Sequence, residues 1–75
     1  MNPLLENLRS RLPQVLTRRQ VAEYLGDFIS VKYLANLDSE GKGPKAYRFG
    51  KRKVLYERDD MLAWLDGRIK PLRSA

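Results

Sequence analysis

Residues 15–44 read VLTRRQVAEYLGDFISVKYLANLDSEGKGP, and this stretch predicts two short helices joined by a turn. The first helix begins at Thr17, whose hydroxyl can cap the amide of Gln20 while the Gln20 side chain reaches back, and it ends at Gly26. Ser30 can cap the second helix, which ends where glycine and proline become frequent. The expected buried face of this second helix consists of Val31, Leu34 and Leu37. The stretch is therefore interpreted as a helix-turn-helix, with the turn at residues 27–29.

After Pro44 the apolar pattern changes from the helical period to the alternation of a β-strand. Aromatic and polar residues alternate up to Phe49, Gly50–Lys53 can form a turn, and residues 54–56 are β-branched or apolar. This pattern predicts a two-stranded β-hairpin with a basic tip. Paired aspartates follow at the start of residues 59–69, where carboxylates favour the positive end of a helix dipole, so we expect a closing helix. The large residues expected in the core are Tyr24, Phe28, Met61, Trp64 and Leu65.

An amphipathic segment at residues 1–14 precedes the helix-turn-helix. Asn2 can cap a helix that Pro3 opens, and Pro13 is expected to end it. The apolar face of this helix consists of Leu4, Leu5, Leu8 and Leu12. Two interpretations are open: the leucines pack on the closing helix to complete the core, or they form a self-association surface. We accordingly expect an α+β fold, with an N-terminal helix or arm at 1–14 and a winged helix-turn-helix domain at 15–70.

The positive charge of the chain is concentrated in the predicted hairpin. The formal net charge is +6, and residues 41–53 contain six lysines and arginines without an acidic residue. A localised basic patch on an ordered element is typical of a nucleic-acid-binding protein. A solvated, lysine-rich loop has the same composition and is the alternative explanation.

The residue types that the chain lacks limit its chemistry. It has no cysteine and no histidine, so disulfides, thiolate metal sites and imidazole catalysis are excluded. No apolar run approaches the roughly 20 residues of a membrane helix, and the first residues lack the apolar region of a signal peptide. We therefore expect a soluble, cytoplasmic protein that is not an enzyme and has no metal site, no cofactor, no small-molecule substrate and no membrane partner.

The order and spacing of these motifs resemble the small prophage and excisionase-type winged helix-turn-helix proteins, which are relatives of the AlpA regulators and of the MerR DNA-binding domain. The resemblance covers residues 15–67, and Asp27 and Phe28 are additional to the family pattern, which implies a wider turn. The matching positions are Leu16, Thr17, Val21, Ala22, Leu25 and Gly26; Leu34, Ala35, Asn36, Ser39, Gly41, Gly43 and Pro44; and Tyr56, Asp60, Ala63, Trp64 and Leu65. The resemblance implies binding to double-stranded DNA, as an excisionase (a recombination directionality factor) or as a transcriptional regulator of a phage or mobile element. An integrase or recombinase is then a candidate partner, and several copies are expected to associate on DNA.

Three groups of residues are candidates for contact with DNA. The recognition helix supplies Ser30, Lys32, Tyr33 and Asn36; the wing supplies Lys45, Arg48, Lys51, Arg52 and Lys53; and the first turn of the preceding helix supplies Arg18 and Arg19. The major groove accepts a helix, and an asparagine can form two hydrogen bonds to an adenine edge. Lysine and arginine side chains suit the DNA phosphates.

The sequence is compatible with two other functions. One is a protein-interaction adapter that docks a recombinase or a terminase, against which the internal basic patch argues. The other is RNA binding, which uses an exposed aromatic platform that we do not expect in this chain.

Overall fold

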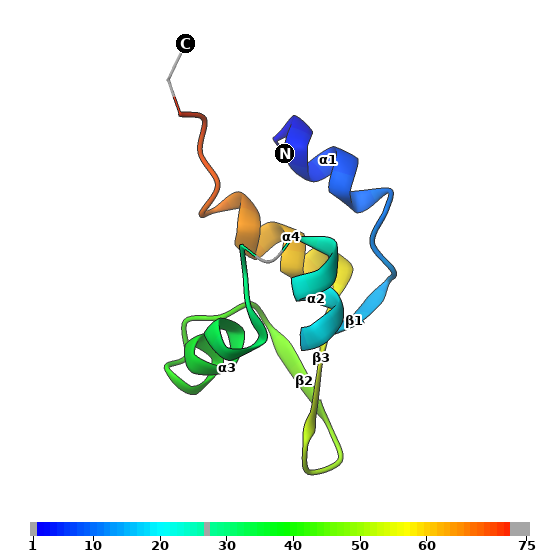
Figure 1. Cartoon of the computed structure of the whole chain (residues 1–75), viewed down its shortest axis with the longest axis vertical. Helices are drawn as coiled ribbons and strands as arrows, with labels where there is room; N and C mark the ends of the chain where they lie inside the picture. The colour runs from blue at the N-terminus through cyan, green and yellow to red at the C-terminus, as the bar shows by residue number, and fades with distance from the viewer. Residues whose placement is uncertain (1, 27, 73–75) are drawn as a thin grey trace.

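The chain forms four helices and one three-stranded antiparallel sheet across residues 2–26 and 28–72, which are the residues that the computed structural model describes (Figure 1). In chain order the elements are α1 (Pro3–Arg9), β1 (Val15–Thr17), α2 (Arg18–Tyr24), α3 (Val31–Ser39), β2 (Ala46–Phe49), β3 (Lys53–Glu57) and α4 (Arg58–Asp66). The α+β class is therefore confirmed. Asp27 of the expected turn and residues 73–75 lie outside the described part.

The predicted caps set the ends of the two central helices. The Thr17 hydroxyl accepts a hydrogen bond from the Gln20 amide at 3.1 Å, and the Gln20 side chain accepts one from the Thr17 amide at 3.0 Å. Gly26 has a φ of +66°, the left-handed conformation that terminates α2. The Ser30 hydroxyl accepts a hydrogen bond from the Tyr33 amide at 3.0 Å and starts α3. Both capping predictions are confirmed.

The sheet contains one strand more than the sequence predicts. The strand order is β1-β3-β2, so the predicted hairpin is present, and β1 pairs with the other edge of β3. Leu16 of β1 lies opposite Tyr56, and Tyr47 of β2 lies opposite Leu55. Because β1 has only three residues, it is too short to show an alternating pattern and depends on its pairing with β3.

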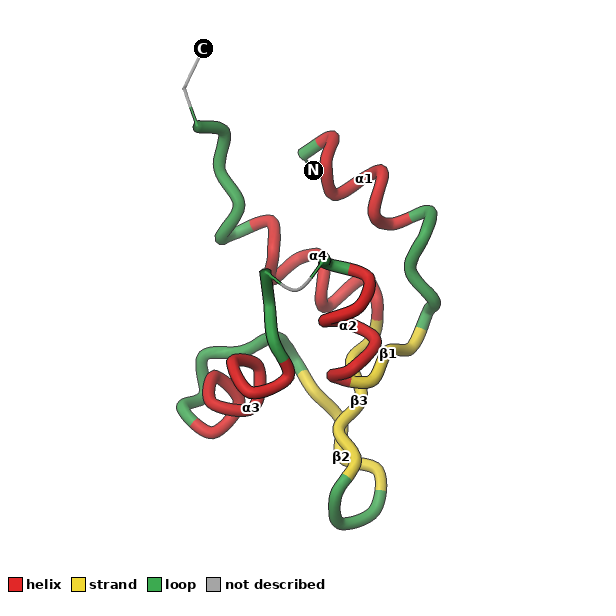
Figure 2. Tube along the Cα trace, in the orientation of Figure 1, coloured by secondary structure: helices red, strands yellow, loops and turns green. Residues whose placement is uncertain are grey.

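The core lies between the helices and the sheet face that carries Leu16 and Tyr56. Its buried members are Leu5, Leu12, Leu16, Val21, Leu25, Ile29, Leu34, Tyr56, Met61, Leu62 and Leu65. Figure 2 shows the hairpin projecting away from the helices, so its tip has no share in this core.

Helix α1 belongs to this core and packs against α4. Leu5 and Leu12 are buried, and Leu8 packs against the core together with Trp64 and Ile69, whereas Leu4 is 53% exposed. The leucine face therefore completes the core, which contradicts its use as a self-association surface. The helix ends at Arg9, before the expected Pro13, and Leu12 reaches the core from the following turn.

Three residues expected in the core are exposed instead. Tyr24 is 42%, Phe28 61% and Val31 44% exposed. The helices α2 and α3 have seven and nine residues and each buries only a narrow stripe, so Tyr24 and Val31 on their flanks remain in solvent. Phe28 lies in the connection between these two helices, outside both stripes. Among the described helices, none has the length and apolar character needed to cross a membrane.

Candidate nucleic-acid interface

Helix α3 and the tip of the β2–β3 hairpin lie at the end of the molecule opposite α1 (Figure 1). The first turn of α2 separates them and forms a groove with both. This groove is lined by Thr17, Arg18, Arg19, Val31, Arg52, Lys53 and Val54. All the charged side chains in this lining are cationic. The structure therefore brings two of the five predicted wing cations, Arg52 and Lys53, together with the predicted phosphate-binding arginines of α2, whereas Lys45, Arg48 and Lys51 do not line this groove.

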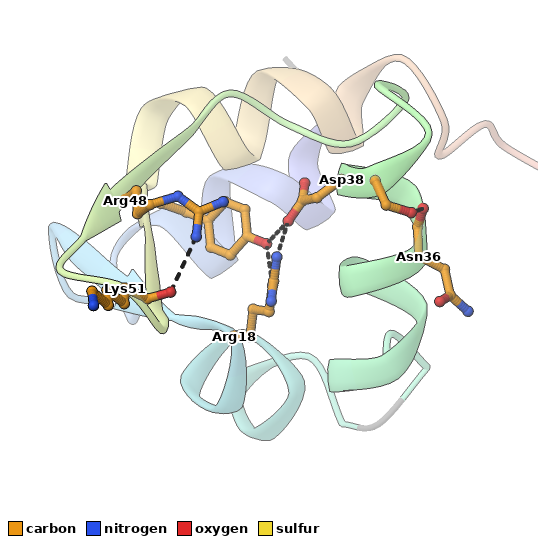
Figure 3. A network of polar contacts seen from close by, with 7 residues as sticks. Arg18, Asn36, Asp38, Arg48 and Lys51 are labelled. Carbon is orange, nitrogen blue, oxygen red and sulfur yellow. Dashed lines mark hydrogen bonds and ion pairs between the residues drawn. The ribbon is translucent and has the colours of Figure 1, made fainter.

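The predicted recognition residues are all exposed, at the start of α3 and along its outer side. Lys32 and Asn36 are exposed, and Figure 3 shows the Asn36 side chain pointing away from Arg18 and from the hairpin. The Ser30 hydroxyl caps the helix. Tyr33 is 47% exposed and also lines a hollow with Phe28, Ile29, Trp64, Leu65 and Arg68, on the flank of α3 that faces α4. Because Tyr33 and Asn36 are three residues apart, they are neighbours on the surface of α3, and a DNA contact by Tyr33 stays a prediction.

The wing cations are all exposed. The Arg48 guanidinium donates a hydrogen bond to the carbonyl oxygen of Lys51 at 3.3 Å and so braces the turn, in which Gly50 has a φ of +67° (Figure 3). The Lys45 ammonium lies 5.5 Å from the centre of the Tyr47 ring. Hydrogen bonding to the Tyr47 hydroxyl raises the pKa of Lys45. The cations at the tip are Lys51, Arg52 and Lys53. None of them forms an ion pair within the described residues.

Arg18 takes part in a polar network that joins α2, α3 and β3 (Figure 3). Its guanidinium donates to Asp38 at 2.8 Å and to the Tyr56 hydroxyl at 3.1 Å, and the Tyr56 hydroxyl donates to the same Asp38 oxygen. Two of the five guanidinium donors of Arg18 are therefore engaged within the fold, through Nε and Nη2. Arg19 is exposed, and phosphate contact by either arginine stays a prediction.

Sequence reasoning missed this network, although one signal was present. Asp38 lies one turn after Leu34, on the side of α3 that faces the core, where an acidic residue needs a partner. A Cβ at Gly43 would collide with the Asp38 carboxylate, so glycine lets the loop after α3 pack over this group.

The network shifts the pKa values of two of its members. Burial lowers the pKa of Arg18, but the hydrogen bonds with Asp38 and Tyr56 outweigh it and raise the pKa above its ordinary value. Burial and the hydrogen bond to Asp38 raise the pKa of Tyr56 to about 12. The network therefore consists of the Arg18–Asp38 ion pair and the neutral phenol of Tyr56, and it lies between the helices and the sheet.

Tyr56 is expected to make the fold sensitive to alkaline pH. Because its pKa is 10.0 in an ordinary environment and about 12 here, the folded chain holds this proton more tightly than the unfolded chain. Its contribution to stability is complete below pH 10.0 and is lost as the pH rises towards about 12. Urea midpoints measured across this range should decline for the native chain and decline less for Tyr56→Phe. The exposed Tyr24→Phe serves as the control and should follow the native chain, and an equal decline in Tyr56→Phe would contradict the assignment.

No group of three or more carboxylate, imidazole or thiol side chains that could hold a metal ion occurs in the described ranges. Comparison of the chain with models of known protein families, with curated proteins and with solved structures finds no match.

Proposed function

We propose that the chain is a winged helix-turn-helix protein that binds double-stranded DNA, with α2 and α3 as the helix-turn-helix and the β2–β3 hairpin as the wing. The observation that carries this proposal is the groove between α2, α3 and the hairpin, whose charged lining is entirely cationic. Phosphate contacts of this kind supply most of the sequence-independent affinity of DNA-binding proteins.

Helix α3 is the element that suits the major groove, which is about 12 Å wide and admits one helix. Its exposed side presents Lys32 and Asn36, and the Asn36 amide forms no side-chain hydrogen bond within the described residues, so it is available for a base edge. Arg19 and the wing cations then contact the adjoining phosphates.

The Arg18–Asp38–Tyr56 network supports this arrangement because it fixes α3 relative to the wing before DNA is bound. A fixed spacing between the two contact elements lowers the ordering cost of binding. The biological role that we propose is recombination directionality or transcriptional control of a phage or mobile element, with an integrase or recombinase as partner. Both roles need a small basic module that is placed on duplex DNA.

Asn36→Ala tests the proposed contact with bases. On a duplex selected from a random pool, the variant is expected to lose about 1–3 kcal/mol of binding free energy, and much less on random duplexes. Fluorescence anisotropy with labelled duplexes, at two salt concentrations, measures both losses.

Asn7→Ala is the matched control, since Asn7 is an exposed asparagine on α1 and lies at the other end of the molecule. Equal losses on selected and random duplexes would mean that Asn36 does not read a base. Failure of the native chain to bind any duplex at low salt would contradict the proposed function itself.

A further inference from the structure

The face of the hairpin that points away from the core carries two aromatic rings. Tyr47 and Phe49 are two residues apart on β2, so both side chains lie on the same face. They lie opposite Leu55 and Lys53 of β3, whereas the buried Tyr56 belongs to the other face. Tyr47 is 48% and Phe49 67% exposed. The expectation that the chain lacks an exposed aromatic platform is therefore wrong.

Nothing in the fold accounts for the exposure of these rings. A single exposed apolar residue is ordinary, but two neighbouring rings on a projecting hairpin form a flat apolar surface. Figures 1 and 2 show that the distal part of the hairpin extends beyond the helices, so the helices leave this face open.

A lysine accompanies each ring. The Lys45 ammonium lies 5.5 Å from the centre of the Tyr47 ring, and Lys53 is the cross-strand partner of Phe49. Rings that stack on bases, combined with cations that pair with phosphates, are the means by which proteins bind single-stranded nucleic acid. The paired lysines distinguish this surface from one that would suit an apolar peptide.

The spacing of the rings favours an unpaired strand over a duplex. Side chains two residues apart on a strand are separated by about 7 Å, roughly twice the 3.4 Å rise between stacked bases. Two adjacent bases must therefore unstack from each other to lie on the two rings. Bases inside a duplex expose only their edges, so they cannot use this surface.

We propose that Tyr47 and Phe49, together with Lys45 and Lys53, bind unpaired bases of single-stranded DNA. Each ring stacks on one base, and the Lys45 ammonium moves from the Tyr47 ring to a phosphate. The choice of DNA over RNA rests on the proposed function, because the tip of the same hairpin borders the proposed duplex interface. The stacking itself does not depend on that function.

The experiment measures binding of a labelled oligothymidylate by the native chain and by the double variant Tyr47→Ala/Phe49→Ala. Each lost ring is expected to weaken binding by about 5- to 150-fold. An oligonucleotide of the same length with abasic sites has the phosphates without the bases, and the native chain should bind it about as weakly as the double variant binds oligothymidylate. Binding to duplex DNA should be retained by the double variant.

Two variants serve as controls. Tyr47→Phe with Phe49→Tyr keeps both rings and should bind oligothymidylate like the native chain. Val15→Ala removes an exposed apolar side chain from the neighbouring strand β1 and should also have no effect. These variants separate stacking from a general loss of apolar surface or of folding.

Several results would overturn the proposal. The first two are that the double variant binds oligothymidylate as well as the native chain does, or that it loses equal affinity for single-stranded and duplex DNA. The others are that the native chain binds oligouridylate more tightly than oligothymidylate, or that loss of the rings dissociates a dimer. If the native chain binds oligothymidylate through the rings but binds no duplex, the proposed function fails and the single-strand site stands.

Discussion

Replacing Leu5 with alanine is expected to lower the free energy of unfolding by about 2–5 kcal/mol, which is a large part of the total stability of a chain this short. Leu5 has 0% exposure and belongs to the same buried cluster as Leu62 and Leu65 of α4. Alanine removes apolar contacts and leaves a cavity that a small core can only partly fill. Urea unfolding followed by circular dichroism measures the loss.

Leu4→Ala is the matched control, because it makes the same chemical change one residue away on the same helix. Leu4 is 53% exposed, so its replacement should alter stability by no more than about 0.5 kcal/mol. Equal, small effects of the two variants would contradict the place of α1 in the core. If Leu5→Glu with Leu8→Glu left the melting temperature unchanged and abolished cooperative DNA binding, the self-association surface would be restored.

The features that the sequence predicts well are local ones. Thr17 and Gln20 are three residues apart, and Ser30 caps the amide three residues further on, so the interacting groups appear side by side in the sequence. Glycines with positive φ end α2 and open the hairpin turn for a similar reason, since the requirement is a property of one residue. These signals do not depend on the rest of the fold.

The features that it does not predict depend on distant segments. Arg18 pairs with residues 20 and 38 positions away, and an acidic residue near the end of a helix does not reveal which cation it contacts. Strand β1 exists only because β3 offers a free edge. The alternation around Tyr47 predicts a strand but not which of its faces is buried, and that face is determined by where the helices pack.

The triple variant Lys51→Ala/Arg52→Ala/Lys53→Ala is expected to weaken binding to all duplexes alike. Each lost phosphate contact reduces the slope of log affinity against log salt by about 0.9, so three contacts reduce it by about 2.7. The loss should therefore be largest at low salt and should nearly vanish at high salt. Stability should be unchanged, because these cations form no ion pair within the described residues.

A second variant separates a wing contact from a change in net charge. Arg11→Ala/Lys70→Ala also removes positive charge, but both residues are exposed and neither lines the groove between α2, α3 and the hairpin. If the wing contacts DNA, this control should leave the salt slope nearly unchanged, because the slope counts neutralised phosphates and not the charge of the protein as a whole. Unchanged low-salt affinity of the triple variant would exclude the wing from the duplex interface. Because Asn36→Ala alters the preference between sequences and the triple variant alters the salt slope, the two experiments assign base reading to α3 and phosphate binding to the hairpin independently.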